Sequence, residues 1–239
     1  MSTDVPVWAV IPASGTGSRM GAEIPKQYLK IQDKTLLEHS LDRLLSHPQI
    51  AGAVLALRED DEYWQALEYS AEKPVFITHG GEQRHHSVYS GLTTLQYRCG
   101  NNLLALVHDA VRPLVTHEEL DRVIAAARAN EAGAILACAV TDTLKREGDS
   151  QVIEATLSRE RLWRAQTPQV FHLAPLLNAL SGVIESGTAI TDDAQAIELL
   201  GYQPALVEGS SENLKITTPG DLRLAEMIWL DQHHQQDDK

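Results

Sequence analysis

Residues 7–26 read VWAVIPASGTGSRMGAEIPK, an apolar run followed by a glycine-rich segment. The apolar run predicts a buried strand, and the glycines let backbone N–H groups come close to phosphate oxygens. Arg19 and Lys26 add positive charge to the same segment. We therefore interpret it as a strand that delivers a triphosphate-binding loop to the end of a sheet. A tight strand-exit turn with two solvated cations is the alternative.

This segment departs from both common nucleotide fingerprints. A Walker loop needs Gly-Lys-Ser or Gly-Lys-Thr, whereas Ser18, Arg19 and Met20 follow Gly17 here. A dinucleotide-binding loop has a third glycine where this chain has Met20, and it runs directly into a helix. This chain continues instead to Pro25. The ordered combination of strand, glycines, arginine and Pro-Lys nevertheless favours phosphate binding over a plain turn.

The composition excludes several classes of protein. Of the 239 residues, 43% are hydrophobic and 22% are charged, which is ordinary for a globular chain. No apolar run approaches the roughly 18 residues of a membrane span, and the N-terminus lacks the features of a signal peptide. A net charge of −13 disfavours nucleic-acid binding. We expect a cytoplasmic protein that binds neither a membrane nor nucleic acid.

Short apolar runs alternate with amphipathic stretches through most of the sequence. This pattern is typical of α/β proteins, in which helices pack on a mainly parallel sheet, and the continuous hydrophobicity indicates strands buried on both faces. We predict a single Rossmann-like domain. The candidate strands are Trp8–Pro12, Ala53–Leu57, Val75–Thr78, Leu103–His108, Ala134–Val140 and Ala205–Val207.

Helix starts are marked by capping residues. Thr35 with Glu38 and Thr116 with Glu119 form capping boxes, in which the threonine accepts from a backbone N–H and the glutamate reaches back. Thr218 precedes a proline suited to the first helical position. We expect this last helix to end at about Trp229, with the polar residues beyond it frayed.

The segment from about Thr141 to Leu157 breaks the alternation and predicts a hairpin arm. An arm without a core of its own usually packs against something, and a second subunit is one candidate. A mobile surface hairpin is the alternative. We predict one domain over residues 1–232, with the arm at about 141–160 and a polar tail at 233–239.

Polar residues recur where the predicted strands end, which is where open parallel sheets bind ligands. Glu82 or Ser87 could pair with the polar edge of a nucleobase. Asp109 could serve a divalent cation or a ribose hydroxyl, or could simply form an ion pair with Arg112. Lys215 interrupts an extendable segment and could face a ligand or lie solvated at an edge.

Short motifs occur in one order along nearly the whole chain. They are Pro-Ala-Ser-Gly-Thr-Gly-Ser-Arg-Met from Pro12, Pro-Lys-Gln-Tyr from Pro25, Gly-Gly-Glu-x-Arg from Gly80, His-Asp-Ala-Val-Arg-Pro from His108, Asp142-Thr143-x-Lys145, Gln166-Thr-Pro-Gln169, Thr191-Asp192-Asp193 and Asn213-x-Lys215. In this order they resemble the motifs of the 2-C-methyl-D-erythritol 4-phosphate cytidylyltransferases of the non-mevalonate isoprenoid pathway.

The resemblance implies a nucleotidyltransferase that joins CTP to a sugar-alcohol phosphate and releases pyrophosphate. Mg²⁺ would accompany the triphosphate, and an oxygen of the acceptor phosphate would attack the α-phosphorus. In such a transfer, positioning and charge stabilisation dominate catalysis.

The resemblance also assigns roles to individual residues. Arg19 and Lys26 match the pair that stabilises charge at the α-phosphate and the departing pyrophosphate. Lys215 joins them as a catalytic residue that grips anionic oxygens. The nucleotide-binding set is Ala13, Ser14, Gly15, Gly17, Gly81, Glu82 and Ser87. The substrate-binding set is Asp109, Thr143, Arg159, Thr167 and Thr191, with Asp109 also a candidate ligand for a Mg²⁺ ion bound mainly by phosphates.

In the family that the motifs resemble, the arginine at the position of Arg159 reaches a neighbouring subunit's site, which implies a homodimer built through the arm. Two positions depart from the family pattern, where Ser14 and Val111 replace common alanines. A cytidylyltransferase for another polyol phosphate, such as ribitol 5-phosphate, remains an alternative. The second alternative is a regulatory protein that binds nucleotide without catalysis. Two cations beside the α-phosphate, Arg19 and Lys26, favour an enzyme over this alternative.

Overall fold

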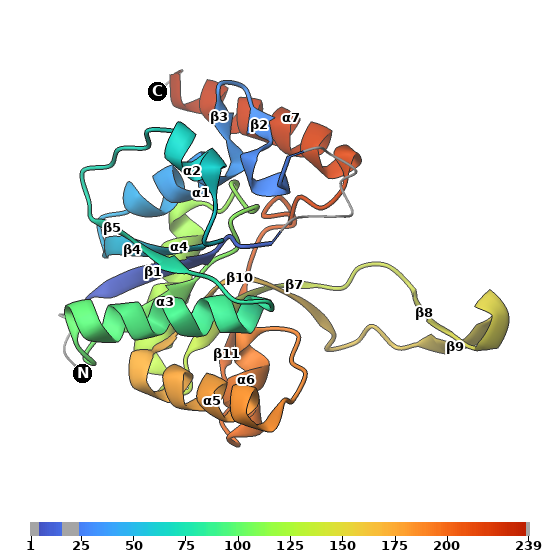
Figure 1. Cartoon of the computed structure of the whole chain (residues 1–239). Coiled ribbons are helices and arrows are strands. Elements are labelled where there is room, and N and C mark those ends of the chain that lie inside the picture. The colour runs from blue at the N-terminus through green and yellow to red at the C-terminus, as the bar shows by residue number, and fades with distance from the viewer. Residues whose placement is uncertain (1–4, 16–23, 238–239) are drawn as a thin grey trace.

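A seven-stranded sheet forms the centre of the protein, with the strand order β11-β7-β10-β6-β1-β4-β5 (Figure 1). The computed structural model describes residues 5–15 and 24–237, with side chains through residue 232. The strands of this sheet are β1 (Val7–Pro12), β4 (Ile50–Leu57), β5 (Val75–His79), β6 (Leu104–Val107), β7 (Ala134–Ala139), β10 (Trp163–His172) and β11 (Ala205–Glu208). Each expected strand is present, and the predicted α/β fold with a mainly parallel sheet is confirmed.

Strand β10 was not among the expected strands. It lies between β6 and β7 and pairs antiparallel with both. Its sequence contains the polar residues Gln166, Thr167 and Gln169, so it is not the continuous apolar run that predicts a buried strand. All three side chains are nevertheless buried. They are accommodated because each is hydrogen-bonded inside the protein.

Helices cover both faces of the sheet (Figure 1). Alternate side chains of β1 point to opposite faces, so Ala9 and Ile11 join one core and Trp8 and Val10 join the other. The first core contains residues of α1 and α4, and the second contains residues of α3, α5 and α6. The helices are α1 (Leu36–Leu45), α2 (Glu62–Ala66), α3 (Arg84–Cys99), α4 (His117–Ala129), α5 (Leu173–Ser186), α6 (Asp193–Leu199) and α7 (Pro219–Asp237).

The expected helix starts agree with the structure. Both capping boxes are formed, Thr35 with Glu38 at the start of α1 and Thr116 with Glu119 at the start of α4. Thr218 also precedes α7, but the expected end of that helix is wrong, because α7 continues past Trp229 to Asp237. The added residues contain neither glycine nor proline, and their glutamines are good helix formers.

A small hairpin, β2 (Lys30–Ile31) and β3 (Lys34–Thr35), follows the 3₁₀ turn Lys26–Tyr28. Ile31 belongs to a third apolar cluster, in which Ala225, Ile228 and Trp229 of α7 also pack. This cluster anchors α7 beside the first part of the chain. In the described ranges, no helix combines the length and the apolar character needed to cross a membrane.

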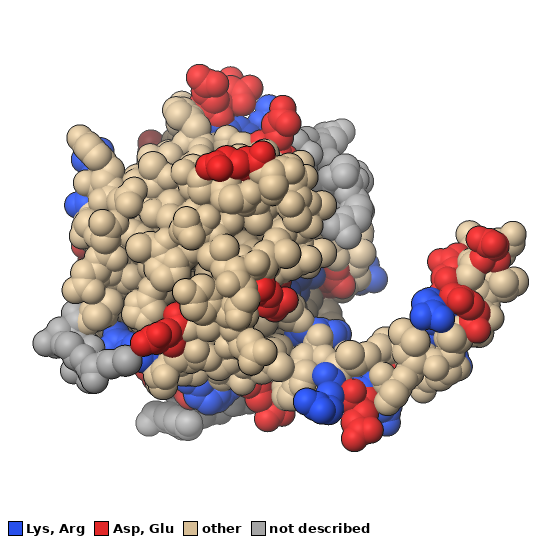
Figure 2. Space-filling view, turned by 90° about the horizontal axis from the view of Figure 1, so that it is seen from below, with Lys and Arg blue, Asp and Glu red and all other residues tan. Residues whose placement is uncertain are grey.

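The predicted arm is present as an antiparallel hairpin of β8 (Leu144–Glu147) and β9 (Ile153–Leu157), joined by the short 3₁₀ turn Asp149–Gln151. Figures 1 and 2 show it standing away from the body of the protein. Near its tip, Val152 and Ile153 are 60% and 66% exposed. The arm therefore carries apolar side chains that its own chain does not cover.

Candidate active site

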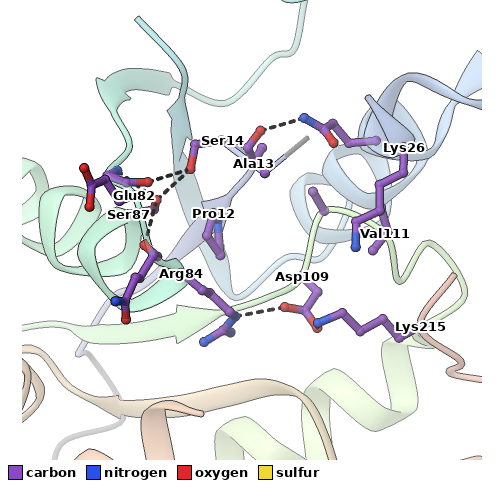
Figure 3. Close-up of a pocket in the computed structure, with 15 residues that line it drawn as sticks. Pro12, Ala13, Ser14, Lys26, Glu82, Arg84, Ser87, Asp109, Val111 and Lys215 are labelled. Carbon is purple, nitrogen blue, oxygen red and sulfur yellow. Dashed lines mark hydrogen bonds and ion pairs between the residues drawn. The ribbon is translucent and has the colours of Figure 1, made fainter. Parts of the chain in front are cut away.

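A pocket of about 220 Å³ lies where β1, β5 and β6 end, at the carboxyl edge of the sheet. Figure 3 shows Lys26 and Lys215 pointing into it from one side, with Ser14 and Glu82 on the other. The pocket collects most of the described site residues expected from the sequence. These are Ala13, Ser14, Gly15, Lys26, Gly81, Glu82, Ser87, Asp109 and Lys215.

One wall of the pocket is held together by small polar groups. The hydroxyl oxygens of Ser14 and Ser87 lie 2.8 Å apart, and the N–H of Gly81 donates to the Ser87 hydroxyl at 3.0 Å. The strand exit and the loop before α3 approach so closely that a Cβ at Gly80 would lie 2.6 Å from the Cβ of Ser14. A glycine is required at position 80, and the wall offers backbone and hydroxyl groups suited to a compact polar ring.

The opposite wall is centred on Asp109. One carboxylate oxygen lies 3.1 Å from Nε of Arg84, and the other lies 3.2 Å from Nε of Arg112 and 3.1 Å from Nζ of Lys215. Burial alone would raise the pKa of Asp109, but the positive charges of Arg84, Lys215 and Arg112 outweigh it and hold the pKa well below its usual range. Asp109 is therefore ionised, and the wall carries a net excess of positive charge.

The surroundings of Asp109 do not fit a metal held by the protein. Both carboxylate oxygens already contact cationic side chains, which would repel a divalent ion. Among the residues with described side chains, no group of three or more histidine, cysteine, aspartate or glutamate side chains could hold a metal. The side chains around Asp109 are therefore suited to receive negative charge.

The turn that presents Asp109 is fixed from behind by His108, which is fully buried. Its Nε2 lies 2.9 Å from the carbonyl oxygen of Arg112, which can only accept, so Nε2 carries the proton. Burial lowers the pKa of His108 to about 4, so the ring is neutral. Its Nδ1 then accepts from the hydroxyl of Thr167 at 3.1 Å, and that hydroxyl accepts from the N–H of Asp109 at 3.0 Å.

The remaining expected residues fall elsewhere. Arg19 and Gly17 lie outside the described residues. Thr167 is buried behind the pocket, and Thr143 and Arg159 are exposed on or beside the arm. Thr191 is exposed, and its hydroxyl bonds to Gln195. In the described single chain, the four acceptor-side residues Thr143, Arg159, Thr167 and Thr191 do not line the pocket.

The structure adds two residues to which the sequence assigned no role. Arg84, the first residue of α3, pairs with Asp109 and also with the buried Asp193, at 2.7 Å between Nη1 and Oδ2. Gln27 donates through Nε2 to the carbonyl oxygen of Ala13 at 2.7 Å. Both residues lie within motifs quoted above, but the sequence did not reveal their partners. For Arg84, the partner Asp193 stands at the start of α6, where an acidic residue is already explained by the helix terminus.

Comparison with known proteins gives a consistent result along most of the chain. The family model described as 2-C-methyl-D-erythritol 4-phosphate cytidylyltransferase matches residues 7–231. A protein of that name from Vibrio vulnificus (strain YJ016) is 47% identical over 218 residues, covering 91% of this chain and 92% of its own length.

Solved structures agree with this match. A crystal structure of 4-diphosphocytidyl-2C-methyl-D-erythritol synthase is 35% identical with a TM-score of 0.82, covering 95% of this chain and all of that one (100%). The 2-C-methyl-D-erythritol 4-phosphate cytidylyltransferase of Francisella tularensis is 32% identical with a TM-score of 0.80, covering 93% and 99% of the two chains. This chain belongs to the 2-C-methyl-D-erythritol 4-phosphate cytidylyltransferase family.

Proposed function

We propose that this protein transfers CMP from CTP to 2-C-methyl-D-erythritol 4-phosphate, giving 4-diphosphocytidyl-2-C-methyl-D-erythritol and pyrophosphate for isoprenoid biosynthesis. Membership of the family supports the reaction. One observation of the site carries it: a single pocket has a wall of backbone and hydroxyl groups on one side and Lys26 and Lys215 on the other. The first wall suits the cytidine, and the lysines suit its phosphates.

The nucleotide is placed by the polar wall. Ala13, Ser14 and Gly15 follow β1, while Gly81 and Glu82 lie in the loop before α3 and Ser87 lies in its first turn, so the base and ribose would lie between these two segments. The exposed carboxylate of Glu82 and the backbone of Gly81 are available to the amino group of cytosine. The α-phosphate is then directed toward the two lysines.

In the reaction, an oxygen of the acceptor phosphate attacks the α-phosphorus and forms the new P–O bond, while the bond to the β-phosphate oxygen breaks. The phosphate monoester is already anionic at neutral pH, so no general base is needed. Lys26, together with Arg19, stabilises negative charge that builds up on the α-phosphate and the departing pyrophosphate. Lys215 has its ammonium fixed by Asp109 and orients the attacking phosphate.

Mg²⁺ would be bound together with the triphosphate of CTP. The ion neutralises part of the phosphate charge when it is bound. Because both oxygens of Asp109 already contact cationic side chains, we do not assign Asp109 as its ligand.

The active form is a cytoplasmic homodimer joined through the arm. This proposal is supported by the exposed apolar residues Val152 and Ile153 and by the position of Arg159, which lies beside the arm and outside its own chain's pocket. A second copy packed on the arm would cover the apolar residues. It would also bring Arg159 to the phosphate of the acceptor in the opposite site.

The reaction is tested by pyrophosphate release from CTP and Mg²⁺ with 2-C-methyl-D-erythritol 4-phosphate. Ribitol 5-phosphate and a reaction without acceptor run in parallel. We expect release with the first acceptor alone. Release only with ribitol 5-phosphate would move the assignment to another polyol phosphate, and release without any acceptor would indicate CTP hydrolysis.

The shared site is tested with a mixed dimer in which one chain carries Lys26→Ala and the other carries Arg159→Ala. Each variant alone should be nearly inactive. In the mixed dimer, the chain with intact Lys26 receives an intact Arg159 from the other copy, so one site of the two regains activity. Mixed dimers that are no more active than either parent would contradict the sharing of Arg159.

A further inference from the structure

Gln27 connects the turn that carries Lys26 to the end of strand β1. Gln27 is 2% exposed, and its Nε2 donates to the carbonyl oxygen of Ala13 at 2.7 Å. The carbonyl can only accept, so the orientation of the Gln27 amide is determined. Ala13 and Lys26 lie on either side of segment 16–23 in the sequence, and this hydrogen bond brings the two flanks together.

Ala13 is held on two sides. Its N–H donates to the carbonyl oxygen of Ala56 at 2.8 Å, which extends the pairing with β4 one residue past the end of β1. Its carbonyl oxygen accepts from Gln27. Because Ala13 is only 3% exposed, loss of the Gln27 donor would leave a buried carbonyl oxygen in need of another partner. The position of Ala13 therefore depends on β4 and on Gln27 together.

The neighbouring residue makes a comparable contact in a different direction. Tyr28 is 4% exposed, and its hydroxyl donates to Oδ1 of Asp61 at 2.7 Å. Asp61 also caps α2 by accepting from the N–H of Trp64. In the described structure, Tyr28 and Asp61 do not line the pocket, whereas Gln27, Lys26 and Ala13 do. The turn thus has one buried hydrogen bond toward the site and one away from it.

We propose that Gln27 is a positioning residue, whose amide holds the backbone of Ala13 and the turn of Lys26 in one fixed arrangement. The inference builds on the proposed function. The cytidine is gripped beside Ala13, and the charge that develops at the α-phosphate is stabilised by Lys26, so the distance between them sets how well the lysine meets the phosphate. Misplacement of a charge-stabilising group by about 1 Å can cost roughly 10²-fold in rate.

The test compares Gln27→Leu with the matched control Tyr28→Phe. Each removes one buried hydrogen bond from the same turn with little change of side-chain volume, so both should lower the melting temperature. Well below those temperatures, we expect Gln27→Leu to lower kcat at least about tenfold. We also expect it to weaken CTP binding, measured by calorimetry, several-fold. The KM for the acceptor should stay within about twofold, because Lys215 lies on a different segment, and Tyr28→Phe should leave both nucleotide parameters near those of the unmodified protein.

The outcomes separate this inference from the proposed function. If the unmodified protein is active and Gln27→Leu keeps its kcat and CTP affinity, the inference is overturned and the function stands. If Tyr28→Phe loses as much activity as Gln27→Leu, the role of Gln27 is structural only, and the inference is again overturned. If the unmodified protein binds CTP but transfers nothing to the acceptor, the proposed function fails, and CTP affinity in the two variants still decides the role of Gln27.

Discussion

Replacing Asp109 by asparagine should destabilise the protein through the cations around it. The Asp109 side chain is 8% exposed, and its carboxylate lies within 3.2 Å of nitrogens from Arg84, Arg112 and Lys215. Asp109→Asn keeps the shape but leaves these cations without that negative charge. Removing one partner of a buried ion pair typically costs about 3–5 kcal/mol.

The expected magnitude lies at the lower end of that range. Arg84 and Lys215 have side chains that are 28% and 36% exposed, so water screens part of their repulsion. We therefore expect the free energy of unfolding to fall by about 3 kcal/mol, which corresponds to a drop in Tm of roughly 6–12 °C for a chain of this size. The control is Glu154→Gln, which breaks the exposed pair with Arg146 on the arm and should change stability by at most about 1 kcal/mol.

The pH dependence gives a second readout. The pKa of Asp109 is lower in the folded protein than in the unfolded chain, so its contribution is complete well above the unfolded value of about 3.9 and is lost as the pH falls below that value. Urea unfolding at pH 6 and at pH 3 should show a larger difference between the native protein and Asp109→Asn at pH 6. A difference under about 1 kcal/mol at pH 6, or one that does not shrink in acid, would refute the reasoning.

Three further changes test other parts of the structure. Lys26→Ala should lower kcat by at least about 10²-fold in the pyrophosphate assay, because it removes a stabilising charge, and near-normal turnover would exclude that role. Thr167→Val leaves Nδ1 of the buried His108 and the N–H of Asp109 without their partner. Thermal unfolding should report a fall of about 1–3 kcal/mol in the free energy of unfolding, and an unchanged Tm would argue against these two buried hydrogen bonds. Leu180 of α5 is fully buried, so Leu180→Ala leaves a cavity in the core. A denaturant titration should show the free energy of unfolding reduced by about 2–5 kcal/mol. A reduction below about 1 kcal/mol would mean that neighbouring side chains fill the cavity.

Local patterns in the sequence predicted much of the fold. The strands with continuous apolar sequence and the helices with capping boxes were found because their signals lie within a few neighbouring residues. Strand β10 was missed because Gln166, Thr167 and Gln169 are buried through partners far away in the sequence. The end of α7 was misplaced because polarity of the sequence does not by itself stop a helix.

The residues of the candidate site also include some that the sequence predicts and some that it does not. Ser14, Lys26 and Glu82 come after predicted strands, so topology predicts that they meet at one edge of the sheet. Lys215 was assigned to the site only through the resemblance of its motif to the family. The contacts of Arg84 with Asp109 and Asp193 join segments that are distant in the chain, and no pattern of spacing specifies them.

The way the arm joins the sheet determines where the protein tolerates changes in length. The arm leaves from the end of β7 and returns into β10, and these two strands pair with each other at Ala139 and Trp163. Val170 packs in the first core and Phe171 in the second, so a single residue inserted between Gln169 and Phe171 would send Phe171 to the wrong face of the sheet. An insertion at the exposed tip, between Asp149 and Gln151, changes no such register. Loops grafted at the tip should therefore leave the fold of the single chain intact, but they would lie beside Val152 and Ile153 and should weaken the proposed dimer. One residue added near the end of β10 should instead disrupt the packing of the sheet itself.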